Sequence, residues 1–112
     1  MNWKPLTTGA QLDDLVAASH HRPQAIFKHS TRCSISSVAL QRMEKGTAPP
    51  GIDFWYLDLL QHRTVSNAVA ERLSVYHESP QVIVVKNGEA VFDASHLEIS
   101  LHDIAEQAGV TG

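Results

Sequence analysis

The strongest constraint on the fold of this chain is the alternation of two apolar patterns along it. Apolar residues three and four positions apart, as in an amphipathic helix, alternate with short continuous apolar runs typical of buried strands. We expect helices that begin near Thr8, run over about 33–45 and 66–73, and begin again after Ser100, and strands over 24–29, 53–59, 82–85 and 89–94. This alternation favours parallel strand pairing, with helices on both faces of the sheet.

Short signals support these elements and add an antiparallel part. Thr8 and Gln11 have the spacing of a capping box at a helix start. Asn87-Gly88 predicts a type I′ hairpin turn between the last two strands. We therefore predict an α/β fold with a central mixed sheet of about four strands flanked by helices on both faces. Trp3 could add a further edge strand or pack over the sheet as a lid.

The composition indicates the size and the setting of the protein. The chain has 112 residues without a repeat or a linker, which predicts one domain over residues 1–112, and 43% of them are hydrophobic. The first residues lack the pattern of a signal peptide, and a lone cysteine suits a reducing compartment, so we expect a cytoplasmic protein. A net charge of −3 favours neither nucleic acid nor a membrane as partner.

The one cysteine, Cys33, lies where a strand pattern changes into a helix pattern. A thiol near the N-terminus of a helix is favoured as thiolate by the free N–H groups and by the helix dipole. Arg32 adds a positive charge, and Ser34 and Ser36 could donate hydrogen bonds to the sulfur. We expect these three residues to stabilise the thiolate. The alternative, a small buried apolar cysteine, fits this polar segment less well.

Ser36 stands where a second cysteine would complete a Cys-x-x-Cys pair. A dithiol resolves its own mixed disulfide, whereas Cys-x-x-Ser must be released by an external thiol. The sequence therefore predicts monothiol chemistry. A mixed α/β sheet with a cysteine directly after its first clear strand is also typical of a thioredoxin-like fold.

Pro80 and the histidines are the other candidates for the site. Pro80 precedes the strand 82–85, and because only about 5–6% of X–Pro bonds are cis, the residues alone favour a trans bond. The seven histidines lack the spacing of a metal site, so we expect no metal. Lys28 and His29 could add to the field at the thiol, and His29 and His77 could lie near it or be structural or surface residues. No chemical role follows for His96.

Several segments resemble one family, the YtxJ-type monothiol bacilliredoxins, which are bacillithiol-system redox-active proteins of the thioredoxin superfamily. The matching segments are Phe27 to Cys33, Ile35-Ser36, Val65-Ser66-Asn67, His77 to Val82, Asn87-Gly88 and Ala94-Ser95-His96. They extend over about residues 5–108. In one respect the chain departs from the family, because Ser34 replaces the proline that usually follows the cysteine.

The resemblance implies a thioredoxin-like fold in which Cys33 is the nucleophile. It implies a cis-proline at Pro80, facing Cys33, and we expect Thr31, Ser79 and Pro80 to line the substrate groove. The implied substrates are proteins that carry a mixed disulfide with a low-molecular-weight thiol, bacillithiol. Cys33 would take up the small thiol, free bacillithiol as co-substrate would regenerate the enzyme, and no bound cofactor is expected.

Two other functions remain open from the residues. The first is a redox-inert binding module of the same fold that holds an extended peptide near Pro80. The second is a reductase of a small oxidised substrate, which ranks lower because the sequence shows no anion pocket beyond Arg32. Replacement of Cys33 separates the first alternative from thiol transfer.

Overall fold

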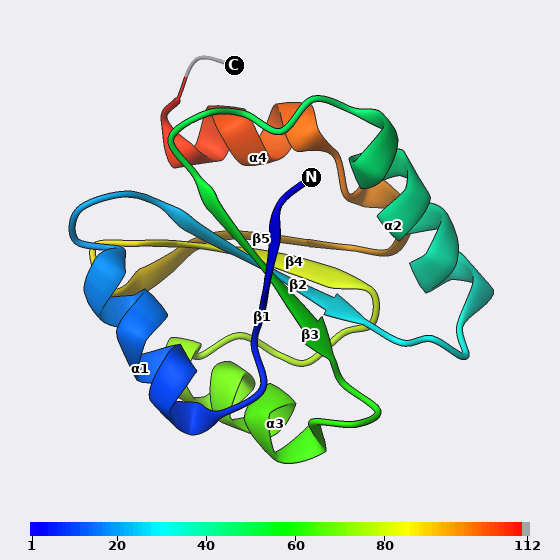
Figure 1. The fold of residues 1–112 in the computed structure, drawn as a ribbon, viewed down its shortest axis with the longest axis horizontal. Helices are drawn as coiled ribbons and strands as arrows, with labels where there is room; N and C mark the ends of the chain where they lie inside the picture. Colours follow the sequence, from blue (N-terminus) through cyan, green and yellow to red (C-terminus); the bar gives the residue numbers. More distant parts are fainter. Residues whose placement is uncertain (111–112) are drawn as a thin grey trace.

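The computed structural model describes residues 1–110, and its centre is a five-stranded mixed sheet between two layers of helices (Figure 1). The strands are β1 (Trp3–Pro5), β2 (Gln24–His29), β3 (Asp53–Asp58), β4 (Gln81–Lys86) and β5 (Glu89–Ser95). The helices are α1 (Gly9–Ala18), α2 (Ser34–Lys45), α3 (Arg63–Leu73) and α4 (Leu101–Ala108), with a short 3₁₀ helix η1 (His96–Glu98) before α4.

The strand order is β1-β3-β2-β4-β5, which places β2 at the centre. β1 and β2 run parallel to β3, whereas β4 runs antiparallel to both β2 and β5. The register pairs Lys28 of β2 with Gln81 of β4. The segment that follows β2 and the segment that precedes β4 therefore lie at the same end of the sheet.

Each face of the sheet carries its own apolar core. Ile26 packs with the buried residues of α1 and α3, and Phe27 packs with those of α2 and α4. Successive residues of a strand point to opposite faces. Because helices cover both faces, all six residues of β2 are buried. Within residues 1–110, no helix is long and apolar enough to cross a membrane.

The predicted order of elements is confirmed, and the predicted edge strand at Trp3 is formed as β1. Thr8 caps α1 together with Gln11, as the capping box predicts. α3 begins earlier than expected, at Arg63 rather than near residue 66. Its first turn is held by a backbone bond from Ser66 N–H to the His62 carbonyl, and no side chain caps it, so the sequence carries no signal for this start.

The inward face of α2 differs from the prediction. Ile35, Val38, Ala39 and Met43 have helical spacing in the sequence, which predicts that all four face the sheet, but Ile35 and Val38 are 42% and 44% exposed. The buried residues of the helix are Ser36, Ala39 and Met43. The buried face of α2 begins with Ser36, because its hydroxyl has polar partners at the end of β2. A prediction from hydrophobic residues alone therefore misplaces this face.

The hairpin between β4 and β5 is tied to the end of α1. Asn87 and Gly88 have positive φ angles of 54° and 80°, as a type I′ turn requires. The Asn87 N–H donates to the Ser19 carbonyl oxygen at 2.9 Å, and the Gly88 N–H donates to Ser19 Oγ at 2.8 Å. Ser19 is 2% exposed, so the acceptors of both hydrogen bonds are buried.

We predict that Ser19→Ala lowers the free energy of unfolding by about 1–2 kcal/mol, because the Gly88 N–H loses its acceptor in a part-buried position. Urea unfolding followed by circular dichroism measures the change. A loss below about 0.3 kcal/mol would show that water replaces the hydroxyl without penalty.

Candidate functional site

Cys33 occupies the N-cap of α2, between the end of β2 and the first helical turn. Its φ and ψ are −108° and 120°, and its side chain is half-buried. The Cys33 N–H donates to the Ser30 carbonyl at 3.2 Å, and the Cys33 carbonyl accepts from the Ser37 N–H at 3.1 Å. The cysteine is thus held by a turn on one side and by the helix on the other.

Cys33 occupies the N-cap position, where a capping residue normally presents a side-chain oxygen to the helix. A capping side chain accepts a hydrogen bond from the free N–H groups of the first turn, and a thiolate is an acceptor of this kind. The thiol side chain makes no capping bond here. Thr31, Arg32 and Ser34 are exposed around it, and the roles predicted for them stay predictions.

Ser36 lies in the first turn of α2, three residues after Cys33, and is fully buried. Its Oγ is 2.6 Å from Nδ1 of His29 and accepts a 3.0 Å hydrogen bond from the Ser30 N–H. The sequence placed this hydroxyl at the sulfur, whereas the structure gives it partners on the far side of the loop. Ser36 thereby joins β2, the loop and α2.

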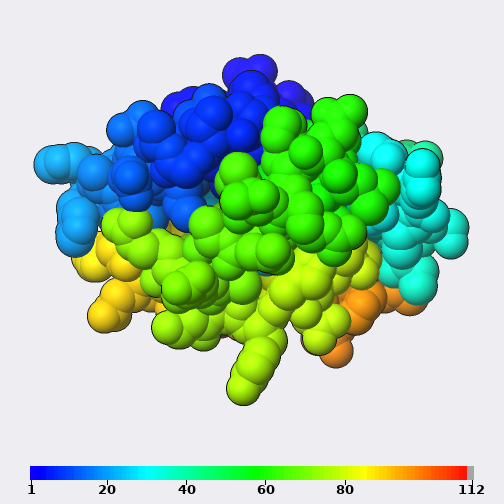
Figure 2. All heavy atoms as spheres, turned by 90° about the horizontal axis from the view of Figure 1, so that it is seen from below, coloured from blue at the N-terminus to red at the C-terminus, as the bar shows by residue number. Residues whose placement is uncertain are grey.

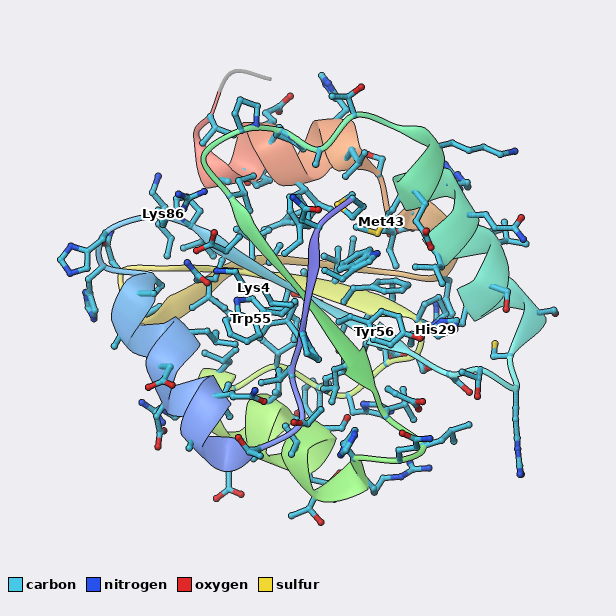
Figure 3. All side chains as sticks on the ribbon, in the orientation of Figure 1. Lys4, His29, Met43, Trp55, Tyr56 and Lys86 are labelled. Carbon is cyan, nitrogen blue, oxygen red and sulfur yellow. The ribbon has the colours of Figure 1, made fainter. Side chains whose placement is uncertain are left out.

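His29 is 3% exposed at the end of β2. Its ring stacks on Phe27 at 5.8 Å between centroids and lies 5.6 Å from the ring of Tyr56, which Figure 3 shows at the same end of the sheet. Burial lowers the pKa of His29, although Asp58 and Glu44 act in the opposite direction. The net shift favours the neutral imidazole.

Pro80 lies at the same end of the sheet, and its bond to Ser79 is cis, as the resemblance implies. Pro80 directly precedes Gln81, the residue that pairs with Lys28 of β2. Figure 2 shows the surface of the segment before β4, in yellow-green, beside the cyan surface of the loop that carries Cys33. Ser79 Oγ is buried, and no hydrogen-bond partner for it occurs among residues 1–110.

His96, to which the sequence assigned no role, supports this proline segment. Its N–H donates to the Pro80 carbonyl at 3.0 Å, and its Nε2 lies 3.8 Å from a carboxylate oxygen of Glu78. The backbone of His96 has a positive φ of 57°. His96, the first residue of η1, therefore contacts the residues on both sides of Ser79.

A buried lysine lies on the opposite face of β2. Lys28 is fully buried, and its Nζ donates to the Ser66 carbonyl and contacts Nδ1 of His77, both at 3.2 Å. Burial lowers the pKa of Lys28 to about 8. Burial also lowers the pKa of His77, and the charges of Lys28 and Arg63 lower it further. An ammonium cannot accept a hydrogen bond, so Nδ1 of His77 is the acceptor.

The sequence missed both buried pairs, although it singled out some of their members. The one available signal was Lys28 and His29 at the end of an otherwise apolar strand. The partners of these residues lie 7, 38 and 49 positions away in the chain, and only the fold brings them together. Among residues 1–110, no three side chains of His, Cys, Asp or Glu are grouped so that they could hold a metal ion.

Comparison with known proteins agrees with this geometry. The family described as monothiol bacilliredoxin BrxC matches residues 4–104. A structure described as a candidate oxidoreductase with a thioredoxin fold is 29% identical, with a TM-score of 0.80 over 92% of this chain and 90% of that one. Thioredoxins from Malassezia sympodialis and Fasciola hepatica are 13% and 20% identical, with TM-scores of 0.73 and 0.69, over 96% and 95% of this chain and 89% and 96% of theirs. At these identities, the two thioredoxins show the fold alone.

We predict that Lys28→Met raises the free energy of unfolding at pH 7 by about 1–3 kcal/mol, because it removes an ammonium that has no carboxylate partner and keeps an unbranched side chain. The folded protein holds this proton with a pKa of about 8 and the unfolded chain with one near 10.5. The wild type should therefore lose about 3 kcal/mol relative to the variant as the pH falls from 10.5 through 8.

Urea unfolding of both proteins from pH 7 to pH 10.5 measures this difference. Subtraction of the two curves of unfolding free energy against pH removes the contributions of the titrating groups that both proteins share. Parallel curves over this range would show that Lys28 is not buried as a charge.

Proposed function

Since this chain belongs to the monothiol bacilliredoxin family, we propose that it removes a low-molecular-weight thiol, bacillithiol, from mixed disulfides on proteins. The observation that carries the proposal is the position of Cys33, a lone thiol at the N-cap of α2, at the same end of the sheet as the Ser79–Pro80 segment. Family and fold support a thiol redox enzyme. The bacillithiol specificity is our proposal.

The proposed thiol–disulfide exchange has two steps, and neither requires an external oxidant or reductant other than the small thiol. The Cys33 thiolate attacks the small-thiol sulfur of the mixed disulfide, the old S–S bond breaks, and the substrate protein leaves as a thiolate that takes up a proton. Cys33 then carries the small thiol. A second small-thiol thiolate attacks that adduct, releases the symmetric small-thiol disulfide and restores Cys33. Neither step needs a bound metal or cofactor.

The surroundings of Cys33 support these two steps. Arg32 and Ser34 flank Cys33 in the chain and are exposed, and we propose that they favour the thiolate as attacking and leaving group. We propose that Thr31, Ser79 and Pro80 line the groove for the substrate chain. We further propose a cytoplasmic setting, in which free small thiol is available to complete the cycle.

We predict that Cys33→Ser abolishes release of bacillithiol from a bacillithiolated protein, because a hydroxyl cannot form the mixed disulfide. Release is followed by mass spectrometry of the substrate protein. With wild type, a single bacillithiol adduct on Cys33 should appear during turnover.

The same variant tests the alternative of a redox-inert binding module. Cys33→Ser that still binds the thiolated protein while losing transfer supports an enzyme. Undiminished transfer, or a wild type that forms no adduct under oxidant, would contradict the proposed function and favour a binding module.

We predict that Ser36→Cys converts the site into a dithiol. Residues three apart at a helix start are close enough for a disulfide, so the new thiol should displace the small thiol from Cys33. The expected products are an internal disulfide, seen as the loss of two hydrogens by mass, and release of the small thiol without added thiol. An adduct that persists on Cys33 would show that the buried position prevents resolution.

A further inference from the structure

Behind Cys33 lies a buried pair, His29 and Ser36, that the proposed exchange does not use. Their polar atoms are 2.6 Å apart, and both residues are almost completely shielded from water. Burial makes this contact more consequential than a surface hydrogen bond, because removal of one partner leaves the other without a replacement.

The pair is connected to Cys33 by two routes. Ser36 accepts from the Ser30 N–H, and the Ser30 carbonyl accepts from the Cys33 N–H, which closes the turn that carries the cysteine. Ser36 also belongs to the first turn of α2, the helix that Cys33 caps. Ser36 is thus linked both to the Ser30–Cys33 turn and to the start of α2.

The ring of His29 is itself held in place. It is stacked on Phe27 and lies against Tyr56, and β2 is paired with a strand on each side. The His29 ring thus connects the central strand β2 to the start of α2. The charged groups that act on this ring are Asp58 of β3 and Glu44 of α2.

We propose that His29 is a positioning residue for the thiol chemistry, acting through Ser36 to hold the Ser30–Cys33 turn so that the sulfur stays at the N-terminus of α2. The serine of Cys-x-x-Ser is then a structural tie between strand and helix. This inference rests on the proposed function in one respect, that Cys33 is the reactive thiol.

The test compares alkylation of Cys33 by iodoacetamide at pH 7 and at pH 10. At pH 10, which is above the ordinary pKa of a thiol, the rate reports mainly access, whereas the rate at pH 7 also depends on how well the helix favours the thiolate. We expect His29→Leu and Ser36→Ala each to lower the ratio of the two rates about 3- to 10-fold, as for loss of one buried hydrogen bond.

Two further variants show whether His29 acts through Ser36. The double variant should show no larger change than either single variant, because both remove the same contact. His29→Asn, whose amide reaches the position of Nδ1, should restore most of the ratio. Additive effects in the double variant, or an unchanged ratio in His29→Leu, would overturn the proposal.

Ser19→Ala is the matched control. Ser19 is also a buried serine that accepts a backbone N–H across two elements, at the hairpin end of α1. This variant should lose stability and keep the rate ratio of wild type. An equal fall of the ratio in Ser19→Ala would show that the ratio follows global stability and would overturn the proposal. The readout needs no bacillithiol, so failure of the proposed substrate leaves it intact, whereas absence of alkylation at Cys33 contradicts the proposed function itself.

Discussion

The site depends on one constraint, the burial of β2 on both faces and along both edges. β3 and β4 pair with β2, and helices cover it above and below (Figure 1). A strand enclosed in this way cannot shift, because a slip of one residue would move every side chain to the wrong face. The loop that follows it therefore begins at a fixed point, and Cys33 lies four residues beyond that point.

The last two residues of β2, Lys28 and His29, point to opposite faces of the sheet. Lys28 points toward α3 and donates to a carbonyl of its first turn, and His29 points toward α2 and contacts a hydroxyl of its first turn. Both residues are polar groups in an apolar strand, and burial lowers the pKa of each. Groups with pKa values shifted by burial and by neighbouring charges concentrate at functional sites.

The sequence carried most of the fold and part of the site. The apolar periods and the Asn87-Gly88 turn predict the order of elements, because these are local properties of the chain. Cys33 and its relation to a helix start are local too, and so is the monothiol pattern with Ser36. The start of α3 and the inward face of α2 were misplaced, because a backbone bond at His62 and a polar contact at Ser36 decide them.

The sequence by itself determined that this chain has one thiol, that a helix begins at it, and that Ser36 cannot resolve a mixed disulfide formed there. These follow from residue types and short spacings. Only the tertiary structure decided that Ser36 faces His29 rather than the sulfur, that Lys28 contacts His77, and that His96 supports Pro80. The physical reason is that each of these contacts joins two elements whose relative position is set by strand register and helix packing. No local pattern contains that information.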